Sequence, residues 1–149
     1  MRIEEEIKQS KFRNDNQKVV INLMYTANWL TTHQEEFFKS FGITPAQYNI
    51  LRILRGQGGE SLSGADIKSR MLERNSDISR LLDRMSKKKL INRTQCPTDK
   101  RVTNVSITKP GLDVLKEIDG QINQAEKKII HLTPVEAHQL SDLLDKLRG

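Results

Sequence analysis

Residues 76–88 form the segment that most restricts how this chain folds. Their apolar side chains recur at positions i, i+3, i+4 and i+7, which places them on one narrow stripe of an α-helix. These side chains are Ile78, Leu81, Leu82 and Met85. Every other face of this helix carries polar or charged residues. We therefore expect the stripe to dock on neighbouring helices and the opposite face to stay free.

Two short β segments follow this helix. Residues 90–95 predict one strand, and residues 102–107 alternate apolar and polar side chains as a half-buried strand does. Between them, residues 96–101 form a polar stretch that contains a proline. The pattern predicts a β-hairpin with a basic tip.

Three helices are predicted ahead of the stripe. The first covers residues 3–39 and ends before Gly42. The second begins at Thr44, where Gln47 completes a capping box, and the third begins at Ser63. The apolar positions expected in the third helix are Ala65, Ile67, Met71 and Leu72.

Further capping signals fix the remaining helices. Asn75 or Ser76 is expected to cap the helix that carries the stripe. After the hairpin, Thr108 is expected to cap a helix that runs to about Ile130. Thr133 opens the final predicted helix with a capping box of its own.

The positive charge of the chain lies in its centre. The formal net charge is +6, and residues 42–107 carry a balance of +7 against zero for residues 1–41 and −1 for residues 108–149. A basic block between neutral helical segments is typical of a nucleic-acid-binding module. A solvated, lysine-rich surface is the alternative, and composition alone does not decide between the two.

The order of the elements favours DNA binding. A helix, a short helix, a turn, a basic helix and a hairpin make a winged helix-turn-helix, whose basic helix enters the major groove. The expected fold is therefore mainly α with a small β-hairpin. The residues expected to contact DNA are Ser63, Asn75, Ser76, Asp77, Ser79, Arg80, Arg84, Lys87, Lys100 and Arg101.

Individual roles follow from side-chain chemistry. The guanidinium of Arg80 is the best candidate for a bidentate contact to guanine, whereas Arg84, Lys87 and Lys88 are expected to meet phosphates. Arg101, at the tip of the hairpin, is long enough to reach the minor groove. Asp99 is expected to brace either that guanidinium or the turn itself.

The same residues resemble a known family. Residues 74–94 (RNSDISRLLDRMSKKKLINRT), the wing residues 99–101 and residues 107–111 (ITKPG) are similar to the MarR family of bacterial regulators. The resemblance covers nearly the whole chain. Lys89 stands where the family usually has glycine, so this helix is expected to end without an easy left-handed residue. Ile107 replaces a leucine, which is a harmless change.

The resemblance implies a single domain that works as a homodimer. Residues 43–108 would form the winged helix-turn-helix lobe, and residues 1–42 and 109–149 the helical dimerisation region, whose apolar stripes need a partner to be buried. A ligand-responsive repressor on a pseudo-palindromic operator of double-stranded DNA is the implied function. The alternative is a non-specific architectural DNA-binding protein.

A ligand cleft is implied between the DNA-binding lobes and the dimer helices, often for small aromatic acids. Tyr25, Trp29 and His33 are four residues apart and share one face of the first predicted helix. Their spacing favours a plain core or dimer contact, and lining of this cleft is the alternative.

No enzymatic or metal site is expected. His33, His131 and His138 lack the spacing of a zinc site, and no nucleophile, base or carboxylate pair stands out. We therefore expect no metal, no cofactor and no catalysis.

Cys96 is the only cysteine, which excludes an internal disulfide and suits a reducing cytoplasm. Lys100 and Arg101 are expected to lower the pKa of its thiol, but no second cysteine is present to resolve an oxidised form, which disfavours redox sensing.

The N-terminus lacks an apolar signal core and no run approaches the roughly 20 apolar residues of a membrane helix. We expect a cytoplasmic location without membrane association.

Overall fold

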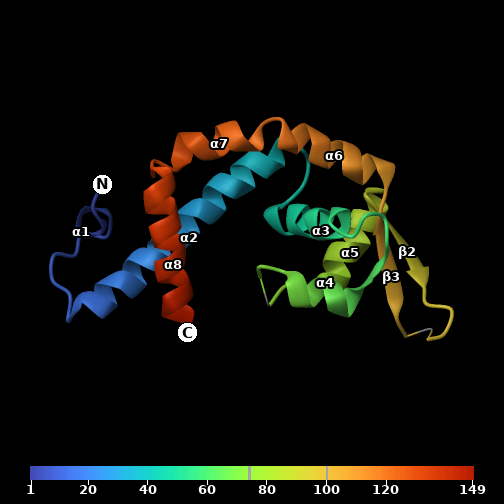
Figure 1. Ribbon diagram of the computed structural model, residues 1–149, viewed down its shortest axis with the longest axis horizontal. Coiled ribbons are helices and arrows are strands. Elements are labelled where there is room, and N and C mark those ends of the chain that lie inside the picture. Colours follow the sequence, from blue (N-terminus) through green and yellow to red (C-terminus); the bar gives the residue numbers. More distant parts are fainter. Residues whose placement is uncertain (74, 100) are drawn as a thin grey trace.

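The computed structural model describes residues 1–73, 75–99 and 101–149. It has the shape of an arch, in which a compact lobe hangs from one end and two long helices extend from the other (Figure 1). The elements in chain order are α1 (Ile3–Glu6), α2 (Asp15–Lys39), α3 (Pro45–Arg55), β1 (Leu62–Ser63), α4 (Gly64–Arg70), α5 (Ile78–Lys87), β2 (Ile91–Gln95), β3 (Thr103–Ile107), α6 (Lys109–Asp119), α7 (Ile122–Ile129) and α8 (Pro134–Arg148). The predicted fold class is confirmed.

The hydrophobic core belongs to the lobe. Helices α3, α4 and α5, the sheet and α6 each contribute fully buried side chains, and the end of α2 adds Phe38. The residues with the least exposure are Ile50, Leu51, Leu54, Ile67, Met85, Val105, Leu115 and Ile118. A core of this kind gives a rigid support for whatever the lobe presents at its surface.

The sheet is antiparallel, in the order β1-β3-β2. Strands β2 and β3 form the predicted hairpin, with Ile91 opposite Ile107 and Gln95 opposite Thr103. The two-residue strand β1 was not predicted. It adds Leu62 beside Val105 and so anchors the start of α4 to the wing.

The helix predicted over residues 3–39 is two helices instead. The Asn14 side chain accepts a hydrogen bond of 2.9 Å from the N–H of Gln17 and thereby begins α2. Ahead of it, Lys8 adopts a left-handed φ of 54°, which is incompatible with a continuous helix. The chain reverses there, and α1 folds back beside α2 through a Lys18–Glu4 ion pair.

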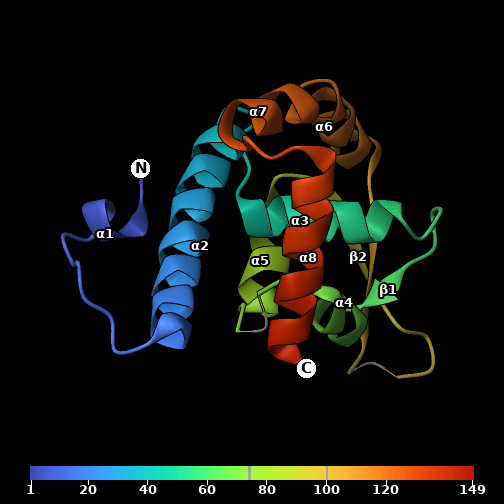
Figure 2. The same ribbon diagram turned by 60° about the vertical axis from the view of Figure 1, so that its left-hand side comes forward.

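The helix predicted from Thr108 to about Ile130 is also interrupted. Helix α6 ends at Asp119 with Gly120 as its C-cap, and α7 begins at Ile122. Glycine is the weakest helix former after proline, because its backbone loses the most freedom on folding. The interruption separates the part of this segment that packs on the lobe from α7, which leads away from the lobe toward α8 (Figure 2).

Lys89 ends α5 in the left-handed conformation, with a φ of 60°. The N–H of Lys89 donates to the carbonyl of Ser86 at 2.9 Å, and the N–H of Leu90 donates to that of Met85 at 3.0 Å. This pair of bonds is a Schellman motif, and its hydrophobic contact comes from the buried Met85 and Leu90. The lysine thus takes the conformation that glycine adopts without strain, at a cost of about 1–2 kcal/mol.

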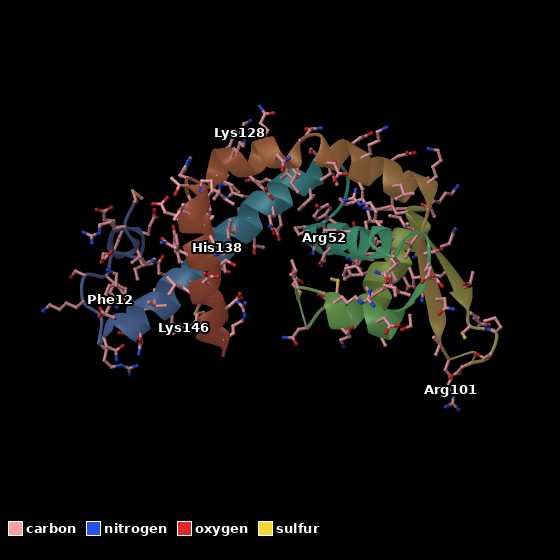
Figure 3. The ribbon with its side chains drawn as sticks, viewed as in Figure 1. Phe12, Arg52, Arg101, Lys128, His138 and Lys146 are labelled. Atoms are coloured by element: carbon pink, nitrogen blue, oxygen red, sulfur yellow. The ribbon has the colours of Figure 1, made fainter. Side chains whose placement is uncertain are left out.

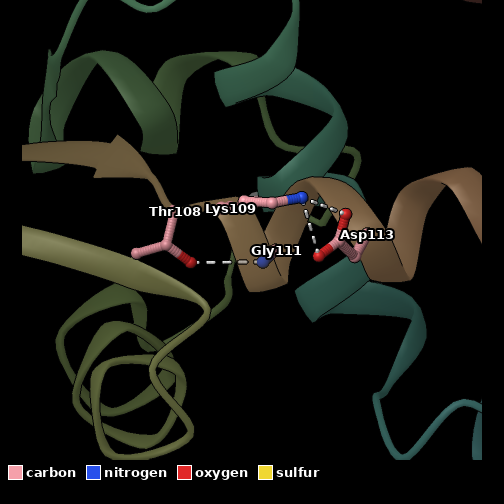
Figure 4. A network of polar contacts seen from close by, with 4 residues as sticks. All are labelled: Thr108, Lys109, Gly111 and Asp113. Atoms are coloured by element: carbon pink, nitrogen blue, oxygen red, sulfur yellow. Dashed lines mark hydrogen bonds and ion pairs between the residues drawn. The ribbon is translucent and has the colours of Figure 1, made fainter.

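Thr108 joins the wing to α5 and α6. As predicted, its hydroxyl caps α6 by accepting from the N–H of Gly111 at 3.1 Å (Figure 4). The same hydroxyl donates to the carbonyl of Lys89 at 2.7 Å. A Cβ on Gly111 would lie 2.4 Å from the carbonyl oxygen of Leu90, so only glycine fits this approach. The end of α5, the end of the wing and the start of α6 are therefore held as one unit.

Candidate nucleic-acid interface

Helices α4 and α5 each begin at a side-chain cap. The Ser63 hydroxyl accepts from the N–H of Asp66 at 3.1 Å and donates to its carboxylate at 2.6 Å. At α5 the cap is Asp77, whose carboxylate accepts from the N–H of Arg80 at 3.2 Å. The prediction that Asn75 or Ser76 caps this helix was wrong. The hydroxyl of Ser76 is used elsewhere, because it donates to Glu73 at 3.1 Å.

Helix α5 buries one stripe and leaves its other faces free. Ile78, Leu82 and Met85 are buried against the lobe, and Leu81 is half-buried. The exposed residues on the remaining faces are Ser79, Arg80, Asp83, Arg84 and Lys87. The side chain of Arg80 is 79% exposed, although its Nε lies 3.2 Å from the Asp77 carboxylate. This polar, mainly basic face is available to a partner.

The turn before α5 differs from the prediction at Leu72. This residue was expected to be an apolar position of the preceding helix, but α4 ends at Arg70 and Leu72 is 79% exposed. Ile67 and Met71 are buried as expected, whereas Ala65 is exposed. Asn75 lies exposed in the same turn.

The wing is tied to α5 by an ion pair between Arg93 of β2 and Asp83. Arg101 is exposed and extends from the tip of the wing (Figure 3). The Asp99 carboxylate accepts from the backbone N–H of Arg101 at 2.9 Å, which is a brace of the turn. Lys100, also expected to contact DNA, lies outside the described residues.

A groove of about 400 Å³ separates α4 and α5 from the wing. It brings together three of the predicted residues, which are Ser63, Ser79 and Arg101. It also contains two cations that sequence reasoning missed, Lys68 and Arg93. Lys68 lies on the exposed face of α4, the helix that Ser63 caps. A cation on the exposed face of this predicted helix was the signal that could have identified it. Three positive side chains therefore line one concave surface, which suits a phosphate backbone.

A second and larger cleft, of about 1040 Å³, lies between the lobe and the extended helices. Helices α2, α3 and α7 and residues 71–73 form its walls. Of the three residues predicted from one face of α2, His33 lines this cleft, but Tyr25 and Trp29 are not among its lining residues.

The positions of Tyr25 and Trp29 have local explanations. The hydroxyl of Tyr25 donates to Glu6 of α1 at 2.6 Å, and this bond raises the pKa of the phenol. The Trp29 ring packs on that of His33 with centroids 4.4 Å apart. Periodicity placed the three residues on one face correctly, but it contained no information on what that face meets.

Helix α3 adds further polar and aromatic groups to the cleft. The ring of Tyr48 stacks on Phe38 with centroids 4.4 Å apart, and burial raises the pKa of its hydroxyl. Asn49 and Arg52 lie on the same side of α3 and also line the cleft. In the sequence, these residues belong to an ordinary amphipathic helix, so no signal distinguished them.

Other chemistry is sparse. Within residues 1–73, 75–99 and 101–149, no three His, Cys, Asp or Glu side chains gather in a way that could hold a metal ion. The pKa of the Cys96 thiol is lowered, chiefly because the Thr98 hydroxyl lies 3.2 Å away and also because backbone N–H groups of the turn face it. No helix within those ranges has both the length and the apolar character of a membrane span.

The arrangement matches known regulators. The MarR family model covers residues 43–103. The chain is 32% identical to the HTH-type transcriptional repressor MdtR of Bacillus subtilis over 113 residues. This matched region covers 75% of this chain and 72% of MdtR. Among solved structures, a MarR transcription factor from Planctomyces limnophilus is 32% identical with a TM-score of 0.71, covering 91% of this chain and 98% of that one.

A third comparison shows the fold alone. Bordetella bronchiseptica BpsR, whose DNA binding is regulated by 6-hydroxynicotinic acid, superposes with a TM-score of 0.77 at 22% identity. The matched region covers 89% of this chain and 99% of BpsR.

Proposed function

Because the chain belongs to the MarR family of DNA-binding transcriptional regulators, which are not enzymes, we propose that it is a ligand-responsive repressor that binds a pseudo-palindromic operator as a homodimer. One observation carries the proposal: the exposed basic face of α5 lies beside a wing whose tip carries an exposed arginine. A helix for the major groove and an arginine for the minor groove are the two parts that this mode of reading requires.

Each exposed side chain has a proposed role. Arg80, near the N-terminal end of α5, contacts a guanine edge, since this end of such a helix usually meets the bases. Arg84 and Lys87 bind phosphates further along. Arg101 enters the minor groove, and Asp77 holds the first turn of α5 and the guanidinium of Arg80 in place.

The extended helices support a homodimer. Helix α8 buries none of its residues, and in α2 only Phe38 is buried. The large apolar side chains that remain exposed on these two helices and on the segment before α8 are Val19, Val20, Leu23, Met24, Tyr25, Trp29, Ile130, Leu132, Val135, Leu140, Leu143 and Leu147. A second copy of the chain would cover this surface and place two α5 helices on one face of the duplex.

Repression and its control by a ligand are proposed from the relatives and from the cleft. MdtR is a repressor, and a small aromatic acid regulates the DNA binding of BpsR. In this chain the larger cleft has walls from both the lobe and the extended helices. A ligand that binds more tightly at one distance between the lobe and the extended helices than at another favours that arrangement. It thereby changes the distance between the two α5 helices of the dimer.

A competition experiment tests the proposal against architectural binding. Fluorescence anisotropy measures binding of the full-length protein to its own upstream region, with and without an excess of random duplex. Specific binding is expected to survive the competitor and to weaken steeply with salt, since phosphate contacts release counterions. If the random duplex displaces the labelled upstream region completely, the architectural alternative is favoured.

Arg80→Ala adds a test of sequence reading. We expect affinity for the specific site to fall by about 1–3 kcal/mol, while affinity for random duplex changes much less. Lys116→Ala is the matched control, because Lys116 is an exposed cation of α6, remote from the wing tip and the N-terminal end of α5. An equal loss on specific and random DNA would assign Arg80 to a phosphate instead.

A further inference from the structure

The buried side-chain amide of Asn49 has no hydrogen-bond partner. Neither its Oδ1 nor its Nδ2 is bonded to any group in the described part of the chain. The residue is only 5% exposed. Burying an unpaired amide costs stability, because the water that it gives up is not replaced. Gln47, the other buried polar residue in the described part of the chain, has a structural use in the capping box at Thr44.

Asn49 lies on the wall of the larger cleft. Pro45, Asn49 and Arg52 follow one another on the same side of α3, at the spacing of helical turns, and all three line this cleft. The terminal torsion of an asparagine is broad, so the amide turns readily toward a bound molecule. The Oδ1 and Nδ2 of Asn49 are both covered in this structure, so a ligand in the cleft pairs with them after the side chain turns toward it.

The cleft that Asn49 lines has an aromatic and apolar part. The stacked rings of Phe38 and Tyr48 form one wall, and Phe37 lies against Phe38 with centroids 5.1 Å apart. The other apolar residues that line the cleft include Leu30, Met71 and Ile122. These walls suit a planar aromatic body.

We propose that Asn49 determines the ligand specificity of this cleft and that it selects an aromatic lactam, a planar ring system in which an N–H and a C=O lie side by side. An asparagine amide offers one acceptor and a donor in the same plane, which is the complement of a cis-amide edge. The inference rests on the proposed ligand response. An aromatic carboxylate offers acceptors only and pairs better with Arg52, so the two ligand classes make different demands on the protein.

Three probes separate these classes. 2-Quinolinone carries the lactam edge, N-methyl-2-quinolinone keeps the ring and the carbonyl but lacks the donor, and 2-naphthoate carries a carboxylate. Each is added to the full-length protein, and both the thermal midpoint and the affinity for the operator are measured. Two variants remove the amide: Asn49→Leu replaces it with a larger apolar side chain and Asn49→Ala with a smaller one. A third variant, Arg52→Ala, removes the guanidinium. Asn123→Leu is the control, because Asn123 is an exposed residue of α7.

With the wild-type protein, 2-quinolinone is expected to raise the thermal midpoint and to weaken operator binding. N-methyl-2-quinolinone is expected to act at least about tenfold more weakly, because it leaves the Asn49 acceptor unpaired. Both Asn49 variants should lose this discrimination and still bind the operator without a probe. The unliganded Asn49→Leu protein should melt no lower than Asn123→Leu, since an unpaired amide has been removed.

Several results would overturn the inference. A marked fall in the thermal midpoint of both Asn49 variants makes Asn49 a structural residue. Equal action of the two quinolinones, or no action of either, removes the lactam class. A response to 2-naphthoate that depends on Arg52 and not on Asn49 assigns the cleft to carboxylates. Failure of the proposed function is a separate result, since it shows as a lack of specific operator binding before any probe is added.

Discussion

Arg101 and Asp99 divide two tasks at the tip of the wing. The carboxylate of Asp99 accepts from the backbone N–H of Arg101 and shapes the turn, while the guanidinium extends from the tip (Figure 3). An exposed arginine at such a tip contributes little to folding. In the function we propose, its value lies in a contact with the narrow minor groove, which concentrates negative potential.

Arg101→Ala is therefore expected to weaken operator binding by about 1–3 kcal/mol and to reduce the slope of log affinity against log salt by about one. The free energy of unfolding should change by no more than an ordinary surface substitution changes it, about 0.5 kcal/mol in either direction. Anisotropy over a salt series and a thermal melt give the two readings. An unchanged affinity would remove the wing from the interface.

Single residues also show where sequence reasoning stops. The caps at Ser63, Thr44 and Thr108 were predicted because each depends on residues three positions apart. The cap of α5 was assigned one or two residues early, since Asn75, Ser76 and Asp77 are all good caps and only the surrounding fold selects among them. The unpaired amide of Asn49 had no local signal at all.

At the scale of elements, both ends of α5 carry a feature that sets its stability. Asp77 at the N-terminus caps the helix and pairs with Arg80. Asp77→Ala is expected to lower the free energy of unfolding by about 1 kcal/mol through loss of the cap. Chemical denaturation measures this change. Asp77→Asn is the control, because it retains a capping oxygen and should lose much less; equal losses would assign the effect to charge.

The C-terminus of α5 predicts a gain. Lys89→Gly should raise the free energy of unfolding by about 1 kcal/mol, because glycine adopts the left-handed conformation of the Schellman motif without a Cβ clash. Lys89→Ala retains the clash and should show no comparable gain in the same denaturation experiment. A loss of stability in Lys89→Gly would mean that the lysine side chain itself supports the helix end.

Element boundaries were predictable where signals are local and strong. The hairpin and the capping boxes at Thr44 and Thr133 were found within a residue or two. The joins at residues 7–14 and at Gly120 were missed, because continuous polarity patterns conceal a change in chain direction. Strand β1 has two residues, too few for any alternation to be read.

The whole molecule combines one well-packed lobe with helices that lack a packing partner. Sequence patterns grouped residues 109–149 with the dimer helices, although α6 buries Leu115 and Ile118 in the core of the lobe. The family resemblance implied the larger cleft, but the patterns did not predict the walls of either cleft, because these walls come from residues far apart in the chain. Such surfaces depend on how elements sit in space, and no spacing along a single helix encodes them.

Leu143→Glu tests the assembly at this scale. Leu143 is 63% exposed on α8, where the proposed partner would bury it, and a carboxylate there is costly to desolvate. The variant is expected to sediment as a monomer. Its affinity for the full operator should fall by about 10²-fold or more, because the two lobes no longer bind as a linked pair, whereas its affinity for a half-site should change little.

The control for this experiment is Leu72→Glu, which introduces the same carboxylate at a more exposed leucine outside α2 and α8. It should remain a dimer by sedimentation. If Leu143→Glu also remained a dimer and kept full operator affinity, the exposed stripe of α8 would not be an interface. If it became monomeric yet bound the full operator as tightly as before, each lobe would bind independently, and the coupling of a ligand to lobe spacing would have no physical basis.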